Sequence, residues 1–456
     1  MKNISVIIVI SGLLLLAERL FLTDGPLFTR FLEFQLVLFW AVAQYKSYKN
    51  FGLFSLYSLF LIGMFIFSIG AVFHFLVSGD DIRFLERGFG DFLFSYHTIQ
   101  ESLWVYSVFV FLSYLGYSYF HATKGVNKIP DYKILRHNPT YFEIGKFLMW
   151  FFLIVEIYKG YLYFNAFNAN RVEIYLYGNM ANPVPSWLRL ISTFFEVGYY
   201  FVLASIPDPK VFKKYSILYF VVLIPEIALG NRGMFGAFIL FYLWYYYTFY
   251  KEQPIKVKYA AIGGVAMLVI FQMMEFIRDG ADASLSSISL TKFLVSQGVS
   301  FYILPLYIDN ANNILYYLYP FILYNIIGGF SGYTGQSVEA LNYKCGVGHQ
   351  LMYTVNSNYY LEGGSFGSSS IVEVYDIGII GLLFFAVFFG YMLTFFERKF
   401  ATKRFFCFTC LFFVCHFVLS ARGSYFPQLY GTVKLFLFYK MILAFKSFIP
   451  GVKNLK

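Results

Sequence analysis

The sequence predicts an all-α polytopic membrane protein, and three observations support this expectation. Of the 456 residues, 59% are hydrophobic and only 13% are charged, which is more apolar surface than a water-soluble fold needs. Apolar runs recur along the whole chain, each near the roughly 20 residues that cross a bilayer as a helix. The runs are continuous and do not alternate, so they predict helices and not a transmembrane barrel.

About twelve membrane-spanning helices are expected, within a single integral membrane domain over residues 1–456. The first run follows Lys2 and is not followed by a small-residue cleavage pattern, so we interpret it as a retained span. In chain order, the spans are predicted at 4–22, 27–45, 51–77, 98–120, 143–165, 187–206, 215–230, 233–250, 259–277, 374–396, 405–421 and 433–449.

The cationic residues set the predicted orientation. Lys and Arg concentrate in the short connections that we place inside, such as Lys46 with Lys49, Lys213 with Lys214, and the tail at 450–456. This asymmetry follows the positive-inside rule and places both termini in the cytoplasm. It also explains the net charge of +10, so we expect a lipid bilayer and no nucleic acid as a partner.

A large outer loop at 278–373 is the stretch that we expect to hold the chemistry. Inside it, residues 300–329 are apolar but interrupted by Pro305 and Pro320. Two short helices lying on or dipping into the outer leaflet fit this pattern better than a full span, because irregular backbone at depth must be shielded by protein.

The first candidate site residue is Arg232, in the very short connection 230–233 between two spans. Asn231 can cap the helix that follows, and the free amide groups of a helix N-terminus attract phosphate. A guanidinium beside them makes a compact phosphate site. The alternative is that Arg232 pairs with Glu226 or reaches lipid headgroups.

Two further arginines are predicted at the outer ends of spans. Arg278 leaves the span 259–277, where Glu275 and Asp279 are alternative partners for its charge. Arg422 ends the span 405–421, where a lipid headgroup is the alternative. Together with Arg232, these residues predict a pyrophosphate site at the outer face.

A Gly/Ser-rich stretch at 362–376 leads directly into the span 374–396. Its glycines and serines suit close approach of the backbone to a polar ligand, so Ser370 and Tyr375 are candidate ligand-binding residues. Glu373 is a candidate ligand or acid–base residue. The spacing of Ser370 and Glu373 also matches a capping box, which is the alternative role.

His349 is the candidate general base, because imidazole titrates near neutrality and can accept a proton from a hydroxyl. A merely solvated loop histidine is the alternative. Glu339 and Glu362 are the other candidate bases.

Several absences limit the possible chemistry. The chain has no D-x-D, HExxH, GxSxG or P-loop motif, so neither metal-dependent use of a nucleotide sugar nor ATP-driven transport is supported, and we expect no metal and no cofactor. Acidic residues do not line the middles of many spans, which argues against a proton-coupled carrier. Cys407, Cys410 and Cys415 fall within one apolar span and are interpreted as buried thiols.

Taken together, these features resemble the bacterial O-antigen polysaccharide polymerase family of the Wzy type. The resemblance covers about residues 140–430 and rests on the span number, the large late loop and three short motifs. The motifs are Gly230-Asn231-Arg232-Gly233, Glu373-Val-Tyr375 and Gly378-Ile-Ile-Gly381.

The resemblance implies a GT-C-like, inverting, metal-independent glycosyltransferase of the bacterial inner membrane. Its substrate would be an undecaprenyl-pyrophosphate-linked oligosaccharide, polymerised en bloc at the periplasmic face, with a Wzz-type chain-length regulator as a partner. The arginines would stabilise the leaving pyrophosphate, and His349 or a carboxylate would deprotonate the acceptor hydroxyl. An O-antigen ligase-like transferase and a flippase or transporter are the alternative functions.

Overall fold

The computed structural model describes most of the chain. The described residues are 12, 15–87, 90–122, 135–169, 184–228, 232–250, 290–330, 336–343, 346–449 and 452. The predicted span at 259–277 and most of that at 4–22 lie outside them, as do Asn231 and Arg278. The backbone of Arg232 is described, but its side chain is not.

Helices occupy the other predicted spans, and two short ones share the span predicted at 405–421. They are α2 (Pro26–Phe51), α3 (Leu56–Met64) continuing through η2 (Phe65–Ile69) into α4 (Gly70–Ser78), α5 (Tyr96–Ala122), α6 (Pro139–Ala169), α8 (Ser186–Ser205), α9 (Pro209–Ala228), α10 (Arg232–Phe249), α19 (Gly378–Thr402), α20 (Arg404–Phe408), α21 (Cys410–Leu419) and α22 (Leu429–Ala444). Within the described residues, five helical stretches are long and apolar enough to cross a membrane: Pro26–Phe51, Leu56–Ser78, Tyr96–His121, Pro139–Ala166 and Gly378–Thr402. The predicted all-α polytopic membrane fold is confirmed.

The span expected at 374–396 begins differently from the prediction. A separate short helix, α18 (Ser370–Tyr375), precedes α19, which starts at Gly378. Gly378 has a φ of 83°, a conformation that favours glycine. The Gly/Ser-rich stretch therefore ends in its own helix and does not run directly into the span.

A β-hairpin between α4 and α5 was not predicted. Strands β1 (Phe84–Arg87) and β2 (Gly90–Leu93) pair antiparallel, with Leu85 opposite Phe92. Leu85 is buried and its neighbours Phe84 and Glu86 are exposed, which is the alternation of a strand with one covered face. The mixed charge of this segment concealed its short period-two pattern.

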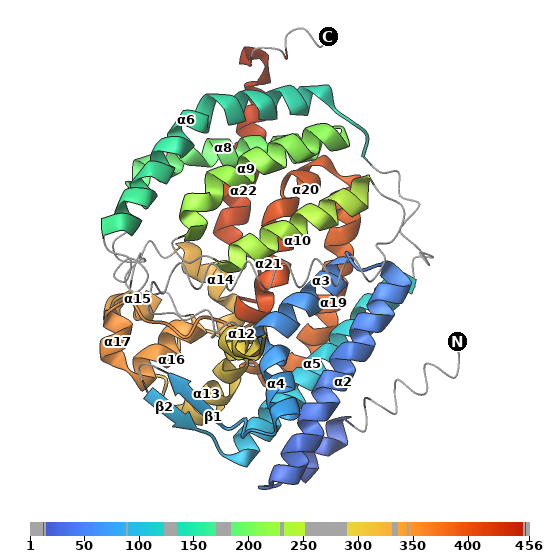
Figure 1. Ribbon diagram of the computed structural model, residues 1–456, viewed down its shortest axis with the longest axis vertical. Helices are drawn as coiled ribbons and strands as arrows, with labels where there is room; N and C mark the ends of the chain where they lie inside the picture. Colours follow the sequence, from blue (N-terminus) through green and yellow to red (C-terminus); the bar gives the residue numbers. More distant parts are fainter. Residues whose placement is uncertain are drawn as a thin grey trace.

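Short helices build the large loop. They are α12 (Leu290–Gln297), η5 (Gly298–Tyr302), α13 (Ile303–Asn310), η6 (Ala311–Asn313), η7 (Phe321–Leu323), α14 (Tyr324–Ile327), η8 (Gly328–Phe330), α15 (Val338–Tyr343), α16 (Val347–Val355) and α17 (Ser357–Leu361). The interrupted apolar segment 300–329 thus holds more short helical pieces than the two that were predicted, because η5, η6, η7 and η8 accompany α13 and α14. Its position in the outer leaflet stays a prediction. Figure 1 shows α15, α16 and α17 gathered beside the β-hairpin at the lower left. That residues 278–373 form a periplasmic loop within a single membrane domain stays a prediction.

One end of the molecule, which we call the loop end, joins the hairpin segment to the large loop. The hydroxyl of Tyr302 donates to the carbonyl of Ile82 at 2.9 Å, and the hydroxyl of Thr98 donates to Asp309 at 2.7 Å. The rings of Phe92 and Phe366 lie 6.3 Å apart. These two segments, both predicted to be outer loops, therefore lie at the same end.

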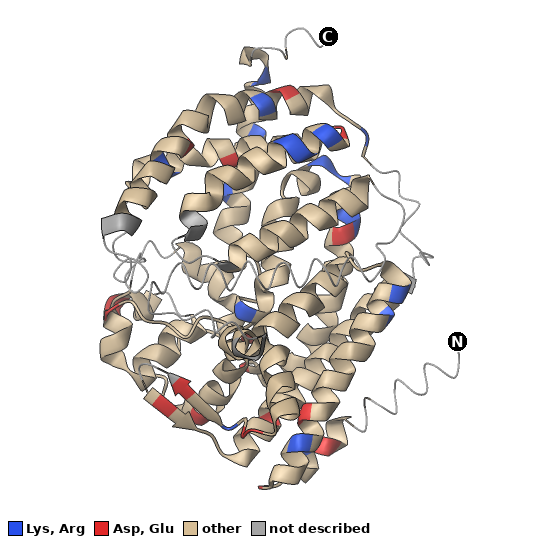
Figure 2. Cartoon of the chain, in the orientation of Figure 1, with Lys and Arg blue, Asp and Glu red and all other residues tan. Residues whose placement is uncertain are grey.

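The other end, which we call the basic end, joins the segments that were predicted to be inner. Arg404 donates to the carbonyl of Ala204 at 2.5 Å, and Arg398 donates to that of Phe120 at 3.0 Å. Figure 2 shows acidic residues around the β-hairpin and basic residues on α9, far from the hairpin. The orientation of these two ends relative to the membrane stays a prediction.

Glycines set the closest helix crossings. A Cβ added at Gly116 of α5 would lie 2.2 Å from the carbonyl of Val387 in α19, and one at Gly390 of α19 would lie 2.2 Å from that of Ser113 in α5. Gly145 and Gly198 make a similar contact between α6 and α8. Small residues at such crossings let helix backbones pack closely in a membrane.

Candidate functional site

Glu373 joins two segments at the loop end. One carboxylate oxygen accepts a hydrogen bond from the hydroxyl of Ser368 at 2.8 Å, and the other accepts from the backbone amide of Tyr425 at 2.8 Å. The side chain is fully buried, and burial raises the pKa of its carboxyl to about 7 against the opposing effect of these hydrogen bonds. The carboxyl therefore exchanges its proton near neutral pH.

The capping-box alternative for Glu373 does not hold. Ser369, not Ser370, is the N-cap of α18, and no side chain caps this helix. Because the two carboxylate oxygens point to Ser368 and Tyr425, the role of Glu373 is tertiary and not local.

Ser370 and Tyr375 also face protein. Ser370 is fully buried, and its hydroxyl has no hydrogen-bond partner among the described residues. The hydroxyl of Tyr375 donates to Glu101 at 2.6 Å, and Glu101 in turn pairs with Arg19 at 2.7 Å. These contacts fix α18 against α5. The roles of Ser370 and Tyr375 as ligand-binding residues stay predictions.

Arg422 lies in η9 (Ser420–Arg422) and is exposed. Its guanidinium donates to the side-chain oxygen of Gln297 at 3.3 Å and lies 5.8 Å from the ring centre of Phe67. Leu419 lies three residues before Arg422 in the chain. Its side chain packs near Gly233, the residue after Arg232, because a Cβ added at Gly233 would lie 3.5 Å from it. The helix that begins at Arg232 therefore packs beside the helix end that carries Arg422. A phosphate site shared by the two arginines stays a prediction.

His349 lies in α16, within the large loop, and is half-buried. Its Nδ1 is 3.0 Å from the amide nitrogen of Gln336, which also donates to the carbonyl of Gly364 at 3.0 Å. Because an amide nitrogen can only donate, Nδ1 is the accepting nitrogen of this imidazole. The other candidate bases, Glu339 and Glu362, are exposed.

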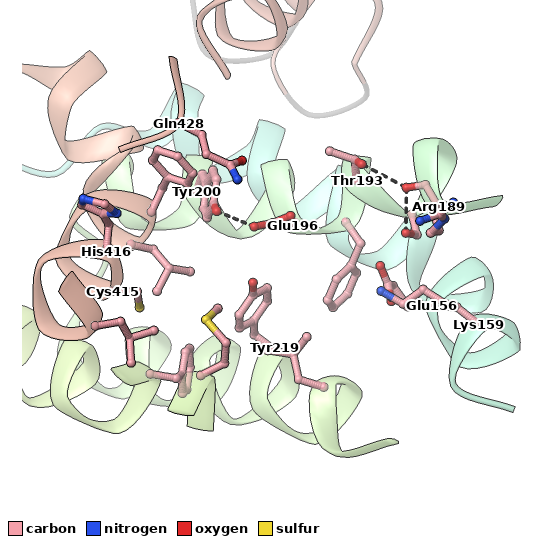
Figure 3. Close-up of a pocket in the computed structure, with 18 of the residues that line it drawn as sticks. Glu156, Lys159, Arg189, Thr193, Glu196, Tyr200, Tyr219, Cys415, His416 and Gln428 are labelled. Carbon is pink, nitrogen blue, oxygen red and sulfur yellow. Dashed lines mark hydrogen bonds and ion pairs between the residues drawn. The ribbon is translucent and has the colours of Figure 1, made fainter. Parts of the chain in front are cut away.

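A cavity of about 500 Å³ lies between α6, α8, α9, α10 and α21. Figure 3 shows side chains from these helices pointing into one space. Its aromatic walls include Phe195, Tyr219 and Phe238. Met234, Leu419 and Gly423 also line the cavity. Arg232 and Arg422 are close to these residues in the chain, so their backbones lie near the cavity wall.

Charged and titratable side chains line this cavity. Lys159 and Glu156 form an ion pair at 2.8 Å, with side chains that are 13% and 4% exposed. The hydroxyl of Tyr200 donates to Glu196, and His416 is half-buried at the opposite wall. Figure 3 shows the ion pair and His416 on opposite sides of the space.

These groups were not among the predicted site residues, although their positions in the sequence carried a signal. Glu156, Glu196 and His416 fall inside the predicted spans. A titratable residue within a membrane span is a functional candidate by default because its burial is costly.

The backbone of Tyr425 connects the cavity to Glu373. Its amide donates to Glu373 at 2.8 Å, and its carbonyl lies 3.2 Å from Nε2 of His416. A carbonyl can only accept, so Nε2 carries the proton and Nδ1 of His416 is an acceptor.

The sequence profile of the family "O-antigen polysaccharide polymerase Wzy" matches residues 2–451. The chain belongs to this family. No curated protein and no solved structure matches it significantly. As a member of the Wzy family, the protein is an integral membrane, glycosyltransferase-like polymerase of O-antigen synthesis that acts on lipid-linked repeat units.

Membership in the Wzy family gives the loop-end arrangement a chemical context. A lipid-linked substrate brings an anionic group to the membrane surface, and Arg422 is an exposed cation at a helix end. The sugars of a lipid-linked substrate require hydrogen-bonding groups close by. The cavity beside Arg422 offers carboxylates, hydroxyls and an imidazole.

Proposed function

We propose that this Wzy family member polymerises undecaprenyl-pyrophosphate-linked repeat units at the periplasmic face by en bloc glycosyl transfer, with inversion and without a metal. The observation that carries the proposal is the bond between Glu373 and the Tyr425 amide. It holds the Gly/Ser-rich stretch against the segment that carries Arg422. We propose that the family's substrate meets the protein at these two segments.

The proposed reaction is a single displacement. The bond between the anomeric carbon of the donor glycan and its pyrophosphate oxygen breaks, and undecaprenyl pyrophosphate leaves. A hydroxyl oxygen of the acceptor unit bonds to that carbon from the opposite face, and its proton passes to a base. The arginines at positions 232, 278 and 422 stabilise the charge that develops on the leaving pyrophosphate.

His349 is the proposed base. Its Nδ1 already accepts a hydrogen bond from Gln336, so this nitrogen is unprotonated and is the one that can take a proton. The acceptor hydroxyl would replace the Gln336 amide at Nδ1, while the amide keeps its bond to Gly364. Gln336 is therefore a positioning residue that selects the tautomer.

Lipid-linked glycans from a deletion strain test the proposal. The deletion should leave the carrier with a single repeat unit, and complementation with Arg422→Ala should do the same at a normal protein level. Long chains on the carrier in the deletion strain would overturn the proposal. If those chains then failed to reach their final acceptor, the protein would be a ligase-like transferase.

The proposed location is the inner membrane, with both termini in the cytoplasm. Cysteine variants at Lys49 of the basic end and Glu86 of the hairpin test this with a membrane-impermeant thiol reagent on intact spheroplasts. Because Cys345 lies in the predicted outer loop, both variants are made in a protein that carries Cys345→Ser. Glu86→Cys should then label and Lys49→Cys should not; the reverse pattern would invert the topology. A Wzz-type regulator is the proposed partner, to be tested by co-purification from membranes.

A further inference from the structure

The cavity between α6, α8, α9, α10 and α21 is lined by ionisable side chains, which a site for a lipid tail would not need. Glu196 lies about 15 Å along α8 from Ser186, at 1.5 Å per residue, which is halfway through this helix. The Glu156–Lys159 pair lies in a stretch that is long and apolar enough to cross a membrane. Ionisable groups at such depth are costly unless a function requires them.

The chemistry of the lining matches a carbohydrate. Sugars present many hydroxyls that both donate and accept, together with apolar ring faces. The cavity offers a carboxylate held by Tyr200, the acceptor nitrogen of His416 and hydroxyls such as that of Thr193. Aromatic side chains such as Phe195 and Phe238 supply flat walls.

The volume limits the size of the ligand. Pockets of about 300–1,000 Å³ enclose one small organic ligand, and this cavity measures about 500 Å³. It can therefore hold a short oligosaccharide but not a long growing glycan. In the proposed reaction, the short saccharide is the acceptor, which is a single repeat unit.

We propose that this cavity binds the saccharide of the acceptor repeat unit, with Glu196 and His416 accepting hydrogen bonds from its hydroxyls. The inference rests on the proposed function and adds a site and a substrate to it. The position of the cavity supports the assignment, because Met234 and Gly423, near the two arginines of the pyrophosphate site, line its wall. The bond from His416 to Tyr425 and on to Glu373 fixes the acceptor nitrogen relative to that site.

Binding by the purified protein in nanodiscs tests the assignment. The probes are the lipid-linked single repeat unit extracted from the deletion strain and undecaprenyl pyrophosphate without sugar. Glu196→Gln removes a charged acceptor but keeps the side-chain shape, so it should weaken binding of the repeat unit about tenfold. Its affinity for undecaprenyl pyrophosphate should be unchanged. Ser192→Phe, which fills the cavity from α8, should give the same pattern.

The matched control is Glu143→Gln, on α6 and paired with Lys146, which should bind both probes like the wild type. Unchanged repeat-unit binding in both cavity variants would overturn the assignment. So would an equal loss of both probes in variants that still elute as monodisperse protein, since the cavity would then hold lipid or pyrophosphate. Either failure leaves the polymerase proposal standing, because only long chains in the deletion strain reject that proposal.

Discussion

Glu373 and His416 both form hydrogen bonds with the backbone of one residue, Tyr425. The carboxylate accepts from its amide at 2.8 Å, and the imidazole Nε2 donates to its carbonyl at 3.2 Å. The buried end of the Gly/Ser-rich stretch and a wall of the cavity therefore share one peptide segment. A substitution at Glu373 should therefore shift the backbone both at Arg422, three residues before Tyr425, and at the wall of the cavity.

Replacing Glu373 by alanine should abolish long-chain polymer. The change leaves the Tyr425 amide and the Ser368 hydroxyl without their acceptor. The amide is buried, and an unsatisfied buried donor costs about 1–3 kcal/mol. Glu373→Gln should retain most activity, because its carbonyl can accept from the Tyr425 amide while its amino group donates to Ser368. A gel of lipid-linked glycans measures both variants.

The control for this series is Glu86→Ala, an exposed carboxylate on β1, which should leave the chain-length distribution unchanged. Equal loss of polymer in the Gln and Ala variants, with normal protein levels, would instead give the ionised carboxylate a direct chemical role.

The stability of the protein should depend on the protonation of Glu373. Burial raises the pKa of this carboxyl from 4.5 to about 7, so the folded state binds the proton more tightly than the unfolded state. This contribution is fully present below about pH 4.5 and is lost as pH rises through 7, amounting to roughly 3 kcal/mol. The Tm in detergent should fall between pH 5 and 8.

Glu373→Gln is the matched test of that pH effect. Its side chain stays neutral at every pH, so the fall in Tm between pH 5 and 8 should become smaller. An unchanged slope in this variant would assign the pH dependence to another group.

The helices were predictable from the sequence because membrane burial demands long apolar runs, and these are local features. The β-hairpin was not predicted because its period-two pattern covers only four residues per strand. The contact of Glu373 with Tyr425 spans 52 positions in the chain, so no local spacing could indicate it. Local spacing instead suggested a helix cap.

The candidate site was predictable only in outline. An exposed arginine after a predicted span is visible in the sequence, and Arg422 indeed lies at a helix end. The cavity was missed because its walls come from helices that are far apart in the chain, namely α6, α8, α9, α10, α14 and α21. Glu156, Glu196 and His416 within predicted spans were the available signs, and the general scarcity of acidic residues in the spans outweighed them.

Removing the amide beside His349 should impair catalysis without removing the imidazole. Gln336→Leu deletes the donor that keeps Nδ1 unprotonated, so part of the population should adopt the other tautomer. We expect a lower kcat, with KM for the lipid-linked unit little changed, in an assay with purified enzyme. Asn356→Leu, which removes a cap of α17 outside this contact, is the control; a similar kcat loss there would indicate general damage to the loop.

The crossing of α5 and α19 should tolerate no added side chain. At Gly116, a Cβ would lie 2.2 Å from the carbonyl of Val387, and backbone atoms cannot move aside without separating the helices. Gly116→Val should therefore lower the amount of folded protein in the membrane severalfold, as measured by fluorescence-detected size exclusion. Gly25→Ala is the control, since nothing lies within 4 Å of its added Cβ and its φ of −158° suits any residue.

Arg422 should be needed for its guanidinium and not only for its charge. Arg422→Ala should leave single repeat units on the lipid carrier, because one cation of the proposed pyrophosphate site is lost. Arg422→Lys should retain only part of the activity, since an ammonium cannot bind two phosphate oxygens as a fork. Arg83→Ala removes an arginine of the hairpin segment, one that pairs with Asp81 at 2.7 Å, and should support normal polymer. If Arg422→Lys matched the wild type, or if Arg83→Ala were equally defective, the effect at Arg422 would be one of general surface charge and the pyrophosphate site would lie elsewhere.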